Sequence, residues 1–330
     1  MSIILVSSPE ENSGKTAAIV ALGQRLRRQG TRIDYRRTNG TEAAADAAFV
    51  SLVFRSGDGP SVTPVDSDHL AADLSQPPGP VDVKIVEVDS AALFNPDDFA
   101  ALRQLGARSL VVARFRPDGL ADAIVEHAGR IPLVSTAVLI NCVPDKGRRL
   151  VDQRVVPSLN MAGLTVIGVV PQDRALLGLS VGDLARSLGA DVLCARDALD
   201  EPVEGVMISA MSDEGAEHYF QRLRRKAVIA GGDRPDIHMP ALATDTTCIV
   251  LTEGYDPDPT VLKTADEQSI PLLKVSPSTV ETLDHVSDAL VAARFRQTFK
   301  VARAVTLFGS NVGEADLDQA LDLVSGRVAI

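Results

Sequence analysis

Short, almost wholly hydrophobic segments alternate with longer amphipathic segments along the first half of this chain. The pattern predicts buried strands at residues 3–7, 32–35, 83–88, 109–113, 137–141 and 165–169. Between them it predicts helices at 16–29, 43–54, 96–105, 118–128 and 148–162. Strands separated by helices indicate an α/β fold with a doubly wound, mainly parallel sheet. Ligands of such sheets lie beyond the carboxyl ends of the strands.

The same alternation begins again after Pro171. Strands are predicted at 191–193, 206–210, 227–230, 248–251 and 272–275, and helices at 181–188, 213–224, 235–243, 258–268 and 277–292. Two more helices, at 297–309 and 314–324, end the chain. We therefore predict two domains, 1–200 and a smaller α/β domain at 201–330. The Gly- and Pro-containing stretch 55–80 predicts a surface loop near the active face, either a plain insertion or a lid.

Composition narrows the classes of partner. The formal net charge of −11 over 330 residues disfavours non-specific binding to nucleic acid or anionic membranes, and the absence of Trp disfavours a base-stacking platform. No apolar segment approaches the roughly 20 residues of a membrane span, and the N-terminus lacks the pattern of a signal peptide. The three cysteines are far apart and show no metal-ligand spacing. We expect a cytoplasmic protein with no nucleic-acid or membrane partner.

The clearest chemical signal is the sequence SPEENSGKT at residues 8–16, between the first predicted strand and the first predicted helix. A strand, a tight loop and a helix that opens with Gly-Lys-Thr is the context of a phosphate-binding P-loop. Lys15 would add a point charge, and the Thr16 hydroxyl is a suitable Mg²⁺ ligand. Pro9 stands where the pattern has its first glycine, so a helix N-terminus that merely contains Gly-Lys-Thr is the alternative.

Several motifs together resemble known families. The chain resembles the dethiobiotin synthetase and cobyrinic acid a,c-diamide synthase group of P-loop proteins at residues 8–16, 83–87, 138–144 and 167–171. The sequences AGGDRPDI at 230–237 and IVLTEG at 249–254 resemble a DRTGG domain. A synthetase-like P-loop domain followed by a DRTGG domain resembles the N-terminal regulatory region of long-form phosphotransacetylases, and the resemblance covers nearly the whole chain.

The resemblance implies ATP and Mg²⁺ as ligands of the first domain. Lys15 would contact the β- and γ-phosphates, with further loop contacts from Asn12, Ser13, Gly14 and Thr16. Mg²⁺ would be held by Thr16, Asp46 and Glu87, with Asp89 as a possible substitute. For Asp46 the alternative is a carboxylate in the first turn of a helix, which interacts favourably with the helix dipole.

The nucleobase side of the site is implied in the same way. Asn141 would recognise the adenine edge, because an amide offers a donor and an acceptor together, and Pro171 would lie near the same pocket. The alternative for Asn141 is a strand-end amide that bonds its own backbone.

The chain also departs from the resembled enzymes. Where dethiobiotin synthetase has a substrate-handling Lys-Pro, this chain has Tyr-Arg-Arg at 35–37, and we select Arg36 as the candidate catalytic cation. The glycine-rich substrate loop is replaced by Glu-Val-Asp-Ser at 87–90, so dethiobiotin synthesis is not expected. No glutaminase Cys–His pair is evident. Long phosphotransacetylases transfer acetyl groups with a further C-terminal domain, so acetyl transfer by this chain alone is not expected.

The DRTGG-like part offers a second candidate pocket. Two loops at the carboxyl edge of its predicted sheet would contribute Gly231, Gly232, Asp233, Arg234 and Thr252. Glycines permit close backbone approach, and Arg234 can bind an anion with two hydrogen bonds. The structural alternative is a tight turn in which Asp233 caps the helix that begins at Pro235 and Arg234 pairs with an acid.

Three functions remain open on the sequence. The first is a regulatory protein that binds Mg-ATP and couples it to a small-molecule effector or a partner enzyme. The second is an ATP-dependent ligase that activates a carboxylate, and slow ATP hydrolysis is compatible with either. The third is a structural role with a vestigial nucleotide site. Synthetases of the resembled group are commonly dimers, so we expect a homodimer.

Overall fold

The computed structural model describes residues 2–38, 43–54, 74, 81–88, 96–131, 133, 135–208, 216–292 and 295–323. Contacts divide the chain into two compact units, Met1–Gln172 with Lys300–Ile330, and Asp173–Phe299. The predicted boundary near residue 200 is therefore misplaced: residues 173–200 pack in the second unit, and the final helices return to the first. The 55–80 stretch, apart from Leu74, lies outside the described residues.

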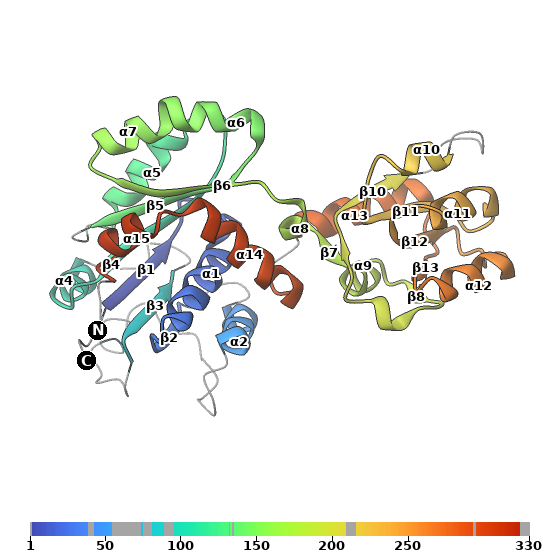
Figure 1. The fold of residues 1–330 in the computed structure, drawn as a ribbon, viewed down its shortest axis with the longest axis horizontal. Coiled ribbons are helices and arrows are strands. Elements are labelled where there is room, and N and C mark those ends of the chain that lie inside the picture. The colour runs from blue at the N-terminus through green and yellow to red at the C-terminus, as the bar shows by residue number, and fades with distance from the viewer. Residues whose placement is uncertain are drawn as a thin grey trace. The chain divides into compact units, whose positions relative to one another are not determined.

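The first unit is built on a parallel six-stranded sheet (Figure 1). Its strands are β1 Ser2–Ser7, β2 Ile33–Arg37, β3 Val83–Glu87, β4 Arg108–Arg114, β5 Thr136–Val143 and β6 Thr165–Pro171. They lie in the order β2-β3-β1-β4-β5-β6, and every neighbouring pair is parallel. The central strand β1 is apolar and buried from Ile3 to Val6. The doubly wound α/β fold predicted from the sequence is confirmed.

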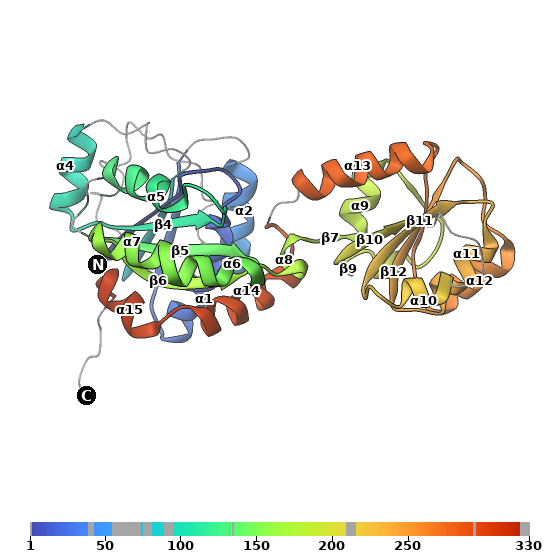
Figure 2. The ribbon, with the colours of Figure 1, turned by 90° about the horizontal axis from the view of Figure 1, so that it is seen from above.

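Helices cover both faces of this sheet. Alternate residues of a strand point to opposite faces, and both faces of these strands carry apolar residues that are buried by helices. Val111 and Ala113 of β4 pack with one layer, whereas Leu110 lies on the other face. The layer on the first face is α4 Pro96–Gln104, α5 Leu120–Gly129 and α7 Val156–Met161. The second face carries α1 Lys15–Arg28, α14 Thr298–Asn311 and α15 Glu314–Ala320 (Figure 2). The remaining elements are α2 Ala43–Phe54, α6 Asp145–Leu150 and the π-helical turn Val151–Val155.

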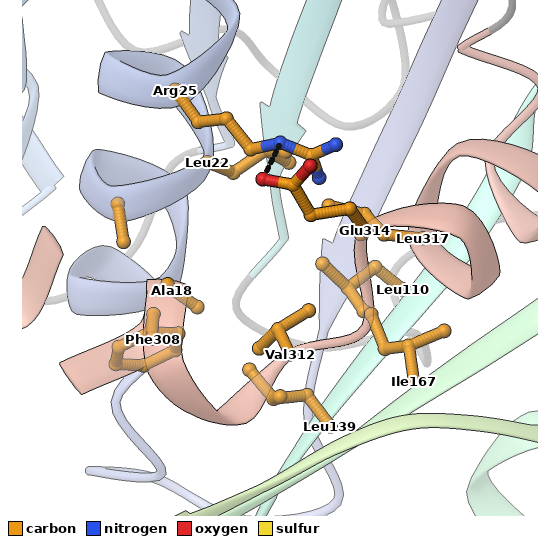
Figure 3. A pocket seen from close by; sticks show the side chains of 12 residues that line it. Ala18, Leu22, Arg25, Leu110, Leu139, Ile167, Phe308, Val312, Glu314 and Leu317 are labelled. Carbon is orange, nitrogen blue, oxygen red and sulfur yellow. Dashed lines mark ion pairs between the residues drawn. The ribbon is translucent and has the colours of Figure 1, made fainter. Parts of the chain in front are cut away.

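The last two helices are anchored to the helix that follows the P-loop. An apolar cavity of about 50 Å³ lies between α1, the sheet and α14–α15, lined by Leu22, Leu110, Leu139, Ile167, Phe308 and Val312 among others (Figure 3). At this seam Arg25 of α1 approaches Glu314 at 3.8 Å and donates to both carboxylate oxygens of Asp318 at 3.1 Å. A backbone bridge also joins Gly168 of β6 to Val312. These contacts explain why residues after 299 belong to the first unit.

The second unit has its own five-stranded sheet, in the order β10-β11-β12-β13-β8. Its strands are β10 Gly205–Ile208, β11 Lys226–Gly231, β12 Thr246–Thr252, β13 Leu272–Lys274 and β8 Asp191–Val192, and a separate pair joins β7 Leu179–Ser180 to β9 Pro202–Val203. The sheet is parallel except for β8, which runs antiparallel to β13. The parallel sheet expected from the sequence therefore carries an antiparallel edge strand.

Helices again cover both faces of the second sheet (Figure 2). The helices α10 Ala216–Phe220, α11 Pro235–Leu242 and α12 Pro259–Glu267 pack on one face. The helices α9 Val181–Leu188 and α13 Thr279–Ala292 pack on the other. A short α8, Arg174–Leu177, and a 3₁₀ turn, Arg196–Ala198, complete the unit. In the described part of the chain, no helix is long and apolar enough to cross a membrane.

Candidate functional site

The loop between β1 and α1 has the backbone of a phosphate-binding loop. Asn12 and Gly14 adopt left-handed conformations, with φ of 54° and 92°. Such reversals turn successive N–H groups toward one concave side, which forms an anion-binding nest. Gly14 is also the N-cap of α1, and its lack of a side chain leaves the first N–H groups of the helix without a side-chain cap. The loop and the helix terminus therefore present N–H donors of the kind that bind a phosphate.

Two side chains of the loop support this assignment. Lys15 is 9% exposed, and its ammonium donates to the Ser8 hydroxyl over 2.8 Å. Ser13 is 1% exposed, and its hydroxyl has no hydrogen-bond partner among the described residues. A buried hydroxyl without a partner is destabilising by about 1–3 kcal/mol, so the loop is better satisfied when a ligand supplies an acceptor.

Asn141, which we expected to recognise adenine, contacts the P-loop. Its Nδ2 donates to the Ser13 carbonyl over 2.9 Å, and its Oδ1 accepts from the Cys142 N–H over 2.9 Å. A Cβ on Gly14 would lie 2.2 Å from the Asn141 Nδ2, so only glycine fits there. The amide retains one N–H and one acceptor lone pair. Asn141 is thus a positioning residue for the loop, and recognition of adenine remains a prediction. Pro171 is the register partner of Val143, which places it beside the same strand end.

The three residues predicted to hold Mg²⁺ meet in one buried cluster. The Thr16 hydroxyl donates to Glu87 Oε1 over 3.1 Å. Asp46 and Glu87 both lie against one guanidinium nitrogen of Arg37, with Nη1 at 3.0 Å from Asp46 Oδ2 and 2.7 Å from Glu87 Oε1. The Tyr35 hydroxyl donates to Glu87 Oε2 over 2.8 Å. The possible substitute ligand Asp89 lies outside the described residues.

Burial and the neighbouring cations act in opposite directions on the pKa of Glu87. The Glu87 side chain is 1% exposed, and burial raises its pKa, whereas Arg37, Tyr35 and Lys15 oppose the rise. Burial also raises the pKa of the Tyr35 phenol, and the adjacent Glu87 charge adds to the increase. Tyr35 therefore remains a hydrogen-bond donor, and the positive charge of Arg37 favours an ionised Glu87.

The arginine that contacts Asp46 and Glu87 is Arg37 and not Arg36, the candidate catalytic cation predicted from the sequence. Neighbouring residues of a strand point to opposite faces, so Arg37 shares its face with Tyr35 and Arg36 does not. The Arg36 Nε donates to Asp34 on that other face, over 3.1 Å, and the structure does not bring Arg36 into the cluster. Strand alternation, counted from Tyr35, was the signal that could have identified Arg37.

A second pair missed by the sequence lies next to the loop. His127 of α5 is 7% exposed, and its Nε2 lies 3.0 Å from the hydroxyl of Ser7, the last residue of β1. Burial lowers the pKa of His127 to about 4, and the nearby charges of Lys15 and Arg130 contribute. The imidazole is therefore neutral at pH 7. No local spacing links the two residues, which are 120 positions apart in the chain.

In the second unit, the predicted pocket residues follow β11 and β12. The Gly232 N–H donates to the Thr252 carbonyl over 3.1 Å, and a Cβ on Gly232 would lie 2.6 Å from the Tyr255 carbonyl oxygen. The Thr252 side chain, which is fully buried, shares a hydrogen bond of 2.8 Å with the Thr279 hydroxyl. The two predicted loops are thus brought together, with their glycines closely packed.

The charged residues of that loop are partly structural. Arg234 forms an ion pair with Asp236, with Nη2 at 2.6 Å from Oδ2, as the structural alternative predicted. Asp233 does not cap α11, because Arg234 is the N-cap residue and the helix has no side-chain cap. The Oδ1 of Asp233 instead turns back to within 2.8 Å of the position that a Cβ on Gly231 would take. An anion would have to compete with Asp236 for Arg234.

Comparisons with known proteins agree with this two-part architecture. Residues 183–289 match the family model of the DRTGG domain. The prediction of a P-loop domain followed by a DRTGG domain is confirmed. A phosphate acetyltransferase from Synechocystis sp. is 28% identical over 156 residues, which cover 44% of this chain and 22% of the relative. One from Nitratidesulfovibrio vulgaris is 24% identical over 223 residues, covering 59% and 31%. The chain thus spans less than a third of the length of either relative.

Solved structures give more distant likenesses. The CBS and DRTGG domains of the regulatory region of Clostridium perfringens pyrophosphatase, complexed with diadenosine tetraphosphate, are 17% identical and cover 40% of this chain and 66% of that one, with a TM-score of 0.30. The cell division protein MinD from Aquifex aeolicus is 13% identical, covers 54% and 85%, and has a TM-score of 0.39. These scores are low, so the fold is assigned from the strand order of this chain itself.

Proposed function

We propose that the first unit binds a nucleoside triphosphate, and specifically ATP, through the loop 8–16, and that the chain is a regulatory protein. The observation that carries the proposal is the loop itself. Asn12 and Gly14 have left-handed backbone conformations before an uncapped helix N-terminus, Lys15 supplies a buried positive charge, and the Ser13 hydroxyl lacks a partner among the described residues. A bound phosphate group would accept hydrogen bonds from the N–H groups and the hydroxyl and would pair with the lysine charge.

The residues have distinct parts in this binding. Lys15 and the helix N–H groups would hold the terminal phosphates, while Asn141 keeps the loop in its binding conformation. Asn141 and Pro171 lie at neighbouring strand ends, where the nucleobase would be placed. Mg²⁺ was expected on Thr16, Asp46 and Glu87, but the Arg37 guanidinium stands between the two carboxylates. The residues do not fit a metal ion in this arrangement, and no step is assigned to one.

The regulatory part of the proposal rests on the second unit. Phosphate acetyltransferases are similar to part of this chain, and residues 183–289 match the DRTGG domain. We propose that a small-molecule effector or a partner enzyme binds the second unit, around Gly231–Arg234 and Thr252, and that it is coupled to the nucleotide. A homodimer remains part of this proposal and is measured directly by light scattering.

Binding and turnover together test the proposal. A regulatory protein should bind ATP and release ADP far more slowly than the about 10 s⁻¹ that is typical of enzymes. Stimulation of ADP release by one member of a carboxylate panel would favour the ligase. Absence of binding to any nucleoside triphosphate would favour a vestigial site. Arg36→Ala should leave binding unchanged, because Arg36 lies on the other face of β2 from Tyr35 and Arg37.

A further inference from the structure

Arg37 is placed between the two carboxylates that a metal ion would need. Its Nη1 lies 2.7 Å from Glu87 Oε1 and 3.0 Å from Asp46 Oδ2. The three side chains are 6%, 1% and 11% exposed, so solvent screens these contacts little. Within the described residues, no group of three or more His, Cys, Asp and Glu side chains is arranged to hold a metal ion.

Glu87 has little capacity left for a further cation. Oε1 accepts from Thr16 and contacts Arg37, and Oε2 accepts from Tyr35. A further cation on Oε1 would therefore have to displace the Arg37 guanidinium, whose Nη1 lies 2.7 Å away. A divalent ion placed between Asp46 and Glu87 would meet the guanidinium at close range. Because arginine stays protonated at every relevant pH, only movement of Arg37 could relieve the repulsion.

We propose that Arg37 is the resident cation of this site and competes with divalent metal ions for Asp46 and Glu87. Arg37 thus decides how far this P-loop depends on a metal ion. With Arg37 in place, the negative charge of a bound triphosphate is met by two side-chain cations, Lys15 and Arg37. Nucleotide binding should then proceed without a divalent ion. The nucleotide part of this inference rests on the proposed function, whereas the competition itself does not.

The competition is tested without nucleotide, by electron paramagnetic resonance of Mn²⁺ titrated into the full chain. Arg37→Gln should bind Mn²⁺ at least about tenfold more tightly than the wild type, because a positive charge next to the ion is removed. Arg36→Gln is the matched control. It removes the same charge from the next residue, on the opposite face of β2, and should bind Mn²⁺ as the wild type does. Asp46→Asn added to Arg37→Gln should abolish the gain.

Two results would overturn the proposal. One is equal Mn²⁺ affinity in the wild type and Arg37→Gln, and the other is an equal gain in Arg36→Gln and Arg37→Gln. The wild type gives a test that needs no variant. If it binds one Mn²⁺ per chain with a dissociation constant of about 10 µM or tighter without nucleotide, Arg37 is not an effective competitor. This titration of the wild type remains decisive even if Arg37→Gln fails to fold, which circular dichroism would reveal.

Calorimetry tests whether nucleotide binding depends on a divalent ion. ATP affinity of the wild type in EDTA should lie within about threefold of its value with Mg²⁺, whereas Arg37→Gln should lose about tenfold in EDTA and regain it with Mg²⁺. A wild type that binds ATP only with Mg²⁺ would contradict the inference and leave the proposed function standing. A wild type that binds ATP under neither condition would contradict the proposed function, while the Mn²⁺ result would still decide the competition.

Discussion

Replacing Gly14 with alanine perturbs the P-loop in two separable ways. The residue has φ of 92°, a conformation that costs an L-residue about 1–2 kcal/mol. The new Cβ would also lie 2.2 Å from Asn141 Nδ2, which must move and lose its hydrogen bond to the Ser13 carbonyl. A hydrogen bond of this kind contributes about 1 kcal/mol. We therefore expect Gly14→Ala to lower the free energy of unfolding of the first unit by about 2–3 kcal/mol.

Urea unfolding followed by circular dichroism measures this loss, and two further variants separate its causes. Gly30 has φ of 83°, and no atom lies within 4 Å of the position that a Cβ on it would take. Gly30→Ala therefore carries the backbone strain alone and should cost about 1–2 kcal/mol. In an Asn141→Ala background, the cost of Gly14→Ala should fall to that of Gly30→Ala. If Gly14→Ala costs no more than Gly30→Ala in the wild-type background, the contact between Gly14 and Asn141 does not position the loop.

Three further predictions concern the effect of a single side chain on stability. Tyr35→Phe removes the donor to Glu87 Oε2 and should lower the unfolding free energy by about 1–3 kcal/mol in urea titrations; no loss would mean that Glu87 is not satisfied by Tyr35. His127 should make stability fall between about pH 6.5 and pH 4, because the unfolded imidazole is protonated below about 6.5 and the folded one only below about 4. The same titrations on His127→Gln should show a smaller loss over that window, and an identical pH profile would contradict the assignment. Arg234→Ala should change the stability of the second unit by less than about 1 kcal/mol, because its ion pair with Asp236 is over a third exposed; a much larger loss would show that the pair is structural.

Local sequence patterns were sufficient to predict the helices, the strands and the loop 8–16. The run Ile3–Val6, the loop glycine and the amphipathic segment after it predicted the strand, turn and helix that position Lys15. The grouping of Asp46 and Glu87 with Thr16 was implied instead by the resemblance to the synthetase group, and the structure places Glu87 against Thr16 and both carboxylates against Arg37. Arg36 was selected by matching a motif position without counting which face of the strand each residue occupies, and the structure places Arg37 beside Asp46 and Glu87.

Local sequence patterns could not predict the contacts between segments that are far apart in the chain. The pairing of His127 with Ser7 joins residues 120 positions apart, and the contacts of the last helices with α1 include those of Arg25 with Glu314 and Asp318. A charge on an amphipathic helix does not identify its partner. For the same reason the helices at the end of the chain were assigned to the second domain, which they follow in sequence but do not join.

ATP binding by the loop 8–16 is tested most directly by a calorimetric titration of the full chain. The titrations would compare the wild type with Lys15→Ala and with Lys263→Ala, which removes an exposed lysine of α12. ATP should bind the wild type and Lys263→Ala equally, and Lys15→Ala should weaken binding about 10- to 100-fold, the effect of one charged hydrogen bond. A wild type without binding, or a Lys15→Ala variant that binds ATP as tightly as the wild type, would contradict ATP binding by this loop.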